Sequence, residues 1–230
     1  MADRPWRWPA RHWPDRPGVT AGLDLLGGGS WLGVNDAGVI AAVLNRINTL
    51  GPAHGRRSRG ELPLVALDHR TAESAAGSIA RIDPLAYRPF NMVIADAESA
   101  YCVRCTDGSE PGMTGANVEI DDIPGGLSML TAYDRNDMRS PRIRRYLPRF
   151  ETAVIPQPDV EDWNDWIALL AARDFDPEAG PGGAMTVVTP TGFGTVCSSL
   201  LALPARRQEQ PLWLFAAGRP GETPFRPIRR

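Results

Sequence analysis

The sequence predicts an α+β fold built from two antiparallel sheets with helices outside them. Strand-like segments occur in pairs, helix-like segments follow them, and strand-like segments return toward the C-terminus. This order indicates antiparallel sheets with separate helices more than alternating strand-helix-strand units. The chain has 230 residues, of which 43% are hydrophobic, and this is enough for a sizeable core. We therefore expect a single domain over residues 1–230.

Residues 27–46 predict a buried β-hairpin, around which the other elements are organised. Two apolar runs, residues 31–34 and 39–44, flank Asn35-Asp36-Ala37-Gly38, whose small polar residues suit a tight reversal. The second run holds no charge, which indicates that both of its faces are covered. It ends at Asn45 and Arg46, and a polar pair at the end of a buried strand is a candidate site.

The segment before the hairpin, residues 1–20, reads as an extended arm rich in Trp, Pro and Arg. Proline fixes φ and cannot donate a hydrogen bond to a strand ladder, so this arm is not a central strand. Its tryptophans either bind a partner or hold the arm against the body of the protein, and we expect the second.

After the hairpin, the sequence predicts a loop at 51–60 and a second helix over 71–82. Between them, Ser58 and Glu61 have the spacing of a capping box for a first helix, and Pro63 indicates that this helix begins a residue or two later than the box would place it. Strands are expected at 90–95 and 100–105, with a further pair at 118–120 and 126–130. Ser140 and Pro141 predict a helix start before residues 142–151, and Asp159 is expected to cap the next helix. Trp163, Trp166, Ile167 and Leu170 of that helix have the spacing of a core stripe. The remaining strands are expected at 185–188, 195–203 and 212–216.

Composition narrows the functional classes. The net charge of -2 gives no overall attraction to nucleic acid, and no segment is apolar for long enough to span a membrane. Three cysteines are too few for a secreted disulfide scaffold, and the first residues lack the apolar core of a signal peptide. We expect a cytoplasmic protein with no nucleic-acid partner and no cofactor.

Several short motifs resemble the NRDE family, which includes transport and Golgi organization protein 2 and has an N-terminal nucleophile hydrolase fold. Gly28-Gly29-Ser30-Trp31-Leu32-Gly33 corresponds to the family's GGTWLG, and Asn45 to an Asn that ends a strand. The family's RSRGxL, GLS and YGT correspond to Arg57-Ser58-Arg59-Gly60-Glu61-Leu62, Gly126-Leu127-Ser128 and Phe193-Gly194-Thr195. The resemblance implies an αββα sandwich of two antiparallel sheets flanked by helices.

The resemblance also implies an N-terminal Cys and an Asn-Arg-Asp-Glu motif, and neither is found here. The chain begins Met1-Ala2, and Ala2 has no nucleophilic atom. Either this is a minimal variant, or the true start lies upstream and a first strand is missing; we expect the second, because a lost strand leaves an open sheet edge. As given, the chain is expected to lack amidase activity.

Asn45 is the candidate catalytic residue. In the resembled hydrolases this amide donates to the oxyanion of the tetrahedral intermediate. The alternative is a turn Asn that bonds neighbouring backbone. Arg56, Arg57 and Arg59 form a basic loop that the family shares and that is a candidate for binding an anionic group of a small-molecule ligand, with Arg57 and Arg59 as the candidate site residues.

Three other clusters are expected to be structural. Cys102 and Cys105 point to opposite faces of a strand and lack a second ligand pair, so no metal site is predicted. The three histidines are scattered along the chain. The arginines between residues 139 and 149 are expected to form a solvated helix face instead of a phosphate site.

The leading hypothesis is therefore an NRDE-type scaffold which, if full length and active, hydrolyses linear amides. The alternative is a non-catalytic binding or trafficking protein, for which the eukaryotic relatives imply lipid- or heme-related handling and secretory-pathway organisation.

Overall fold

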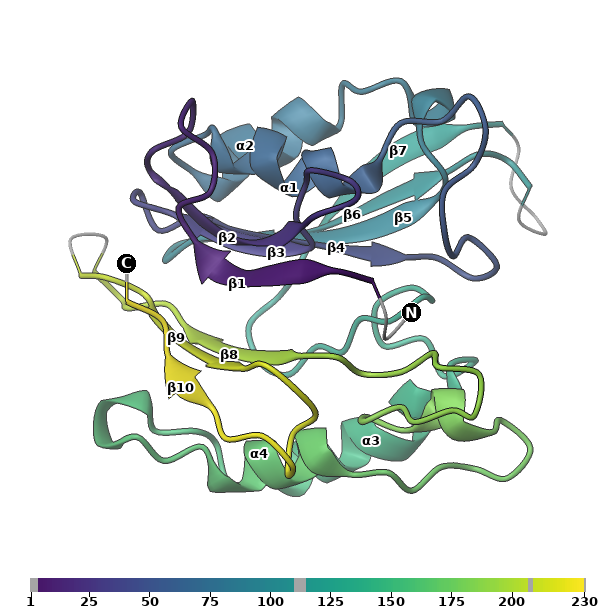
Figure 1. The fold of residues 1–230 in the computed structure, drawn as a ribbon, viewed down its shortest axis with the longest axis vertical. Helices are drawn as coiled ribbons and strands as arrows, with labels where there is room; N and C mark the ends of the chain where they lie inside the picture. The colour runs from purple at the N-terminus through teal and green to yellow at the C-terminus, as the bar shows by residue number, and fades with distance from the viewer. Residues whose placement is uncertain (1–3, 110–114, 207–208, 230) are drawn as a thin grey trace. The chain divides into compact units, whose positions relative to one another are not determined.

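The computed structural model describes residues 4–109, 115–206 and 209–229 (Figure 1). The chain divides into two compact units, each with its own antiparallel sheet. Residues 5–125 make up most of the seven-stranded unit, and residues 126–202 and 211–229 make up most of the three-stranded unit. The predicted mixture of helices with two antiparallel sheets is confirmed.

The sheet of the seven-stranded unit is a meander, in which each strand pairs with the next along the chain. Its strands are β1 (Trp6–Ala10), β2 (Val19–Asp24), β3 (Leu32–Asn35), β4 (Ile40–Asn45), β5 (Phe90–Ala95), β6 (Ala100–Thr106) and β7 (Asn117–Asp122). The arm thus contributes β1 at one edge of this sheet, with a register irregularity between Arg7 and Ala10. Pro9 and this irregularity suit an edge position, because both disturb pairing with a further strand.

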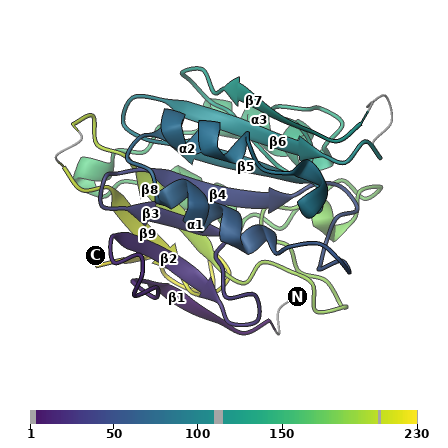
Figure 2. The same ribbon diagram turned by 90° about the horizontal axis from the view of Figure 1, so that it is seen from above.

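Two helices cover one face of this sheet. α1 (Leu62–Leu67) contacts β3 and β4, and α2 (Ala72–Ile79) contacts β5 and β6 (Figure 2). Two short 3-10 helices, η1 (Arg59–Glu61) and η2 (Pro84–Ala86), flank them. The core lies between the helices and the sheet and includes Ala41, Leu62, Ile79, Met92 and Val103, all fully buried.

The three-stranded unit has its own sheet, in the order β10 (Arg226–Pro227), β9 (Leu212–Ala216), β8 (Ser198–Ala202). Its helices are α3 (Pro141–Thr152) and α4 (Asn164–Ala171), with the 3-10 helices η3 (Pro158–Val160) and η4 (Pro181–Gly183). The rings of Phe150 on α3 and Trp166 on α4 meet edge to face, with centroids 5.3 Å apart.

The predicted hairpin is confirmed as β3 and β4. Only Gly38 in its turn takes a positive φ, of 85°. Asn35 organises the reversal instead, because its Oδ1 accepts hydrogen bonds from the backbone N–H groups of Ala37 and Val39, both at 3.0 Å. Its Nδ2 donates to the carbonyl oxygens of Leu67 at 2.8 Å and His69 at 2.6 Å, just beyond α1. One buried amide thus joins the hairpin turn to the end of a helix.

Two of the motif segments lie against each other, backbone to backbone. The N–H of Ser30 donates to the carbonyl oxygen of Gly60 at 2.7 Å. A Cβ on Gly29 would lie 2.3 Å from the carbonyl carbon and oxygen of Gly60. Glycine at position 29 is therefore required by the close approach of η1.

The structure corrects several predicted elements. β2 was not predicted, and residues 126–130 and 185–188 form no strand. β7 pairs with β6 instead of with residues 126–130. Ser58 caps η1, and α1 begins after it at Leu62, where Pro63 fits the first turn.

The predicted start and core stripe of α4 were also wrong. Trp163 occupies the cap position of α4, and Asp159 lies in η3. Of the predicted stripe only Trp163 is buried, and Trp166, Ile167 and Leu170 are half-buried. Helical spacing identified the apolar face of this helix and not the depth of its burial.

Candidate functional site

The polar pair at the end of β4 divides between the two faces of the sheet. Ala41 is part of the core beneath the helices and Val43 packs against that core, so strand alternation places Asn45 on the same side. Asn45 is the register partner of Phe90 at the start of β5, and it is exposed. Arg46 follows on the opposite side and is buried. The predicted amide is thus at the surface, where a ligand can reach it.

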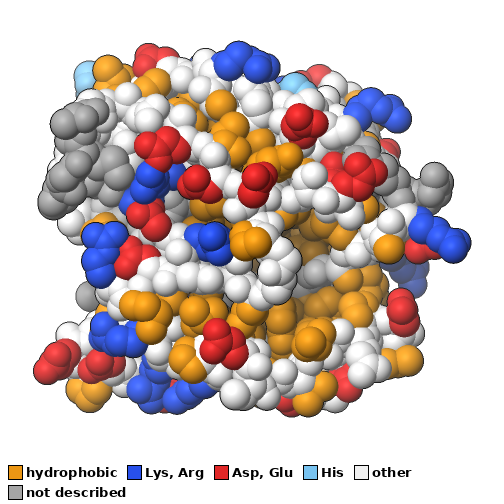
Figure 3. All heavy atoms as spheres, turned by 180° about the vertical axis from the view of Figure 1, so that it is seen from behind, with side chains coloured by type: hydrophobic (Ala, Val, Ile, Leu, Met, Phe, Trp, Pro, Cys, Tyr) orange, Lys and Arg blue, Asp and Glu red, His pale blue; other side chains and the backbone are white. Residues whose placement is uncertain are grey.

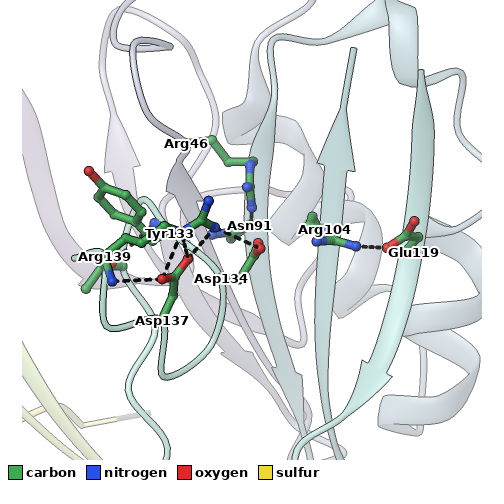
Figure 4. Close-up of polar contacts among 9 residues, drawn as sticks. Arg46, Asn91, Arg104, Glu119, Tyr133, Asp134, Asp137 and Arg139 are labelled. Carbon is green, nitrogen blue, oxygen red and sulfur yellow. Dashed lines mark hydrogen bonds and ion pairs between the residues drawn. The ribbon is translucent and has the colours of Figure 1, made fainter. Parts of the chain in front are cut away.

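A row of polar side chains crosses the face of the sheet that carries no helix. Asn91, Arg104 and Glu119 are successive register partners on β5, β6 and β7. Arg46 donates from Nη1 to Oδ1 of Asn91 at 2.7 Å, and Arg104 forms an ion pair with Glu119 (Figure 4). Sequence reasoning missed this row, although the two-residue period of each strand assigns its members to one face.

Arg59 holds the loop that follows β4. Its guanidinium donates to the carbonyl oxygens of Thr49 at 2.7 Å and Pro89 at 2.9 Å, and to the Thr49 hydroxyl at 2.9 Å. Burial, with a contribution from the nearby positive charge of Arg88, lowers the pKa of Arg59 to about 10. Pro89 precedes Phe90, so Arg59 lies close to the end of β4 at which Asn45 sits.

Arg57 lies in the same loop as Arg59 and is more exposed. Its Nε is 2.7 Å from Oε1 of Glu61, and its guanidinium lies 5.4 Å from the centroid of the Tyr87 ring. The hydrogen bond to Glu61 raises the pKa of Arg57 above its ordinary value. Tyr87 donates its hydroxyl proton to the same carboxylate. Arg57 is thus exposed, with one acidic partner.

Two further arginines complete the group, which we call the basic end of the seven-stranded unit: Arg56, Arg57, Arg59 and Arg88. Arg88 donates to the carbonyl oxygens of Leu50 and Asn48, both at 2.8 Å, and Arg56 donates to those of Leu85 and Tyr87. In the described part of the chain, only Arg57 of these four forms an ion pair. Carbonyl oxygens orient a guanidinium without cancelling its charge. Asp107 acts on Arg56, so the positive charge is least compensated at Arg59 and Arg88, which lie near each other.

The structure therefore gathers all three predicted site residues around one segment, the approach to β5. Asn45 pairs with Phe90, Arg59 bonds to Pro89, and the N–H of Arg57 donates to the carbonyl of Ala86 at 2.8 Å. Their roles as oxyanion donor and anion ligands stay predictions. Arg56 belongs to the predicted basic loop, whereas Arg88 was not predicted as a site residue, and only the fold shows that Arg88 lies beside the loop.

The cysteines lie in buried surroundings. Cys105 is fully buried and faces the helices with Val103, while Cys102 lies on the other side of β6. Burial raises the pKa of the Cys105 thiol to about 12 and that of Cys197 to about 11. Within the described residues, no group of His, Cys, Asp and Glu side chains is arranged to hold a metal ion.

Three arginines of α3 pair with carboxylates, as a solvated helix face would. Arg142 departs from the prediction, because it donates to the carbonyl oxygen of Gly182 at 2.7 Å and burial lowers its pKa. Arg145 and Arg149 both contact Oδ2 of Asp174, at 2.6 Å and 2.8 Å, and Arg144 lies 3.4 Å from Asp176. Just before the helix, Arg139 donates from Nε to Asp137 at 2.9 Å (Figure 4). The hydrogen bond from Arg149, with the bond from Arg145, holds the pKa of Asp174 well below its ordinary range.

This ion-pair cluster predicts a pH-dependent contribution to stability. The folded-state pKa of Asp174 is depressed, so the pairing stabilises the folded state above the ordinary carboxyl pKa and is lost as the pH falls through the lower, folded value. The side chain is 44% exposed, so we expect Asp174→Asn to cost only about 1 kcal/mol at neutral pH. Urea unfolding should show this difference at about pH 5 and a shrinking one below about pH 4. Asp159→Asn, in an exposed position of the same unit, should show no such trend.

Two surface properties bear on partners. On the face shown in Figure 3, Arg side chains are interspersed with Asp and Glu, which is unlike the continuous basic stripe of a nucleic-acid site. In the part of the chain that the structure describes, every helix is too short or too polar to cross a membrane.

These features define an α+β protein with two antiparallel sheets and a group of four arginines at one end of the larger sheet. The family model described as Transport and Golgi organisation 2 matches residues 2–157. This match covers more than half of the chain, which therefore belongs to the Transport and Golgi organisation 2 family. A search of curated proteins found no match for this chain.

Proposed function

We propose that this chain binds a small molecule with an anionic group at the basic end of the seven-stranded unit, next to Asn45. The observation that carries the proposal is the set of four arginines grouped there, of which one has a carboxylate partner. A ligand carboxylate or phosphate would supply the missing negative charge.

Asn45 gives this site a second kind of recognition. An exposed side-chain amide both donates and accepts hydrogen bonds, and strand β4 fixes the position of its backbone. Guanidinium and amide groups together suit a molecule with a carboxylate near an amide, such as an N-acyl amino acid. This is also the substrate type that a hydrolase of linear amides would take.

The protonation state of two of the three thiols favours binding over hydrolysis. Cys105 and Cys197 have pKa values raised to about 12 and about 11 by burial, so at neutral pH both stay protonated. A protonated thiol is a poor nucleophile. A non-catalytic binder fits the lipid- or heme-related handling and the secretory-pathway roles that the family resemblance implies. The three free cysteines support the cytoplasmic location that we propose.

Titration calorimetry with N-hexanoylglycine tests the proposal, with chromatographic detection of released glycine in the same samples. We expect saturable binding to the wild type without glycine release. Asn45→Ala and Arg57→Met should each weaken binding about tenfold, because a hydrogen bond to a charged group contributes about 1.5 kcal/mol. Arg81→Met is the matched control, since Arg81 is an exposed arginine of the same unit outside the basic end.

The outcomes separate the two functions. Equal affinity of the wild type, Asn45→Ala and Arg57→Met for N-hexanoylglycine, or no binding at all, would refute a site at the basic end. Glycine release that stops in Asn45→Ala would instead establish the alternative, amide hydrolysis with Asn45 as the oxyanion donor. Melting curves of each variant check that the loss of affinity is not a loss of fold.

A further inference from the structure

The connection between α3 and α4, residues 153–163, carries an exposed apolar surface in the three-stranded unit. Ile155, Val160 and Val154 have 81%, 68% and 59% of their surface exposed, more than any other large hydrophobic side chain described in this unit. Figure 1 shows this connection as a loop beyond the ends of α3 and α4. We call these three side chains the α3–α4 loop surface.

The loop is held in one shape by its own hydrogen bonds. Gln157 and Asp162 exchange two backbone hydrogen bonds, of 2.8 Å and 3.1 Å, in an isolated antiparallel bridge. The N–H of Val154 donates to Oδ2 of Asp165 at 2.8 Å, and Glu161 takes a left-handed conformation with a φ of 57°. The apolar side chains are therefore presented by an ordered backbone, which lowers the entropy lost when a partner binds.

The charged side chains of this connection all have one sign. Residues 151–165 hold five carboxylates, those of Glu151, Asp159, Glu161, Asp162 and Asp165, and no arginine. The nearest arginine before this stretch, Arg149, is paired with Asp174. Exposed apolar side chains that share a segment with charges of one sign are typical of a protein interface.

We propose that the α3–α4 loop surface binds a polypeptide segment that carries both basic and apolar side chains. The apolar side chains of such a segment would cover Ile155 and Val160, and its Lys or Arg side chains would face the surrounding carboxylates. The acidic rim selects this occupant over an anionic membrane or a nucleic acid, because both would be repelled. The proposal is independent of the ligand site at the basic end.

Fluorescence anisotropy with a labelled amphipathic peptide of leucine and lysine tests this inference. The full chain should bind the peptide, and the double variant Ile155→Ser/Val160→Ser should bind it about tenfold more weakly. The same substitutions at Leu25 and Leu26, exposed leucines of the other unit, should leave binding unchanged. Asp159→Asn/Glu161→Gln should weaken binding and flatten its dependence on salt. A peptide with glutamate in place of lysine should not bind.

Three results would overturn the proposal. The first is equal affinity of the wild type and the Ile155→Ser/Val160→Ser variant for the lysine peptide. The second is binding to phosphatidylserine vesicles that depends on Ile155 and Val160, which would make the surface a membrane contact. The third is self-association in sedimentation velocity that the same variant abolishes, which would make a second copy the occupant.

Discussion

Gly29→Ala is expected to destabilise the protein by about 3 to 4 kcal/mol, because the new methyl group would overlap backbone atoms that cannot turn away. Its Cβ would lie 2.3 Å from the carbonyl carbon and oxygen of Gly60 and 2.9 Å from the nitrogen of Glu61. Relief of this overlap requires the segment of η1 to move, which breaks the 2.7 Å hydrogen bond from Ser30 to Gly60. The measurement is guanidinium unfolding followed by tryptophan fluorescence.

Gly125→Ala is the matched control for this substitution. A Cβ at position 125 has open space around it, and the residue has no positive φ. We expect its stability to stay within about 0.5 kcal/mol of the wild type. If Gly29→Ala proved as stable as Gly125→Ala, the close approach of the two motif segments would not be a feature of the folded protein in solution.

Asn35→Asp is expected to cost about 3 to 5 kcal/mol at neutral pH, although it changes the size of the side chain very little. The substitution replaces the Nδ2 donor with an oxygen that would face the carbonyl oxygens of Leu67 and His69 at 2.8 Å and 2.6 Å. Burial and these two acceptors would raise the folded-state pKa of the new carboxyl group. The loss of stability should therefore be greatest at neutral pH and should shrink as the pH falls toward the unfolded carboxyl pKa, near about 4.

Asn45→Asp makes the same chemical change at the exposed end of the same hairpin. We expect it to alter the free energy of unfolding by less than about 0.5 kcal/mol, because water solvates the new charge. Urea unfolding of both variants across the acidic range gives the comparison. A flat pH dependence for Asn35→Asp would show that position 35 does not hold its buried hydrogen bonds in solution.

The sequence by itself determined the elements whose causes are local. The hairpin of β3 and β4 follows from two apolar runs around Asn35 and Gly38, and α3 begins where Ser140 and Pro141 place it. The family follows from short motifs, since the residues of GGSWLG and RSRGEL stand within the matched region 2–157. Asn45 was identified as a candidate site residue because it is the polar residue at the end of the apolar run of β4.

Tertiary structure decided everything that depends on residues far apart in the chain. β2 has Gly22 in its middle and no clear alternation, and its pairing with β1 and β3 makes it a strand. The composition of the basic end also depends on tertiary structure. Arg88 belongs to it because the segment before β5 lies along the loop that follows β4, where Arg88 donates to backbone carbonyl oxygens. Hydrogen bonds between residues far apart in the sequence depend on how the chain packs, and the local sequence pattern does not determine that packing. Tertiary structure also decided which of Asn45 and Arg46 is on the face covered by the helices, because α1 and α2 pack on only one face of the sheet.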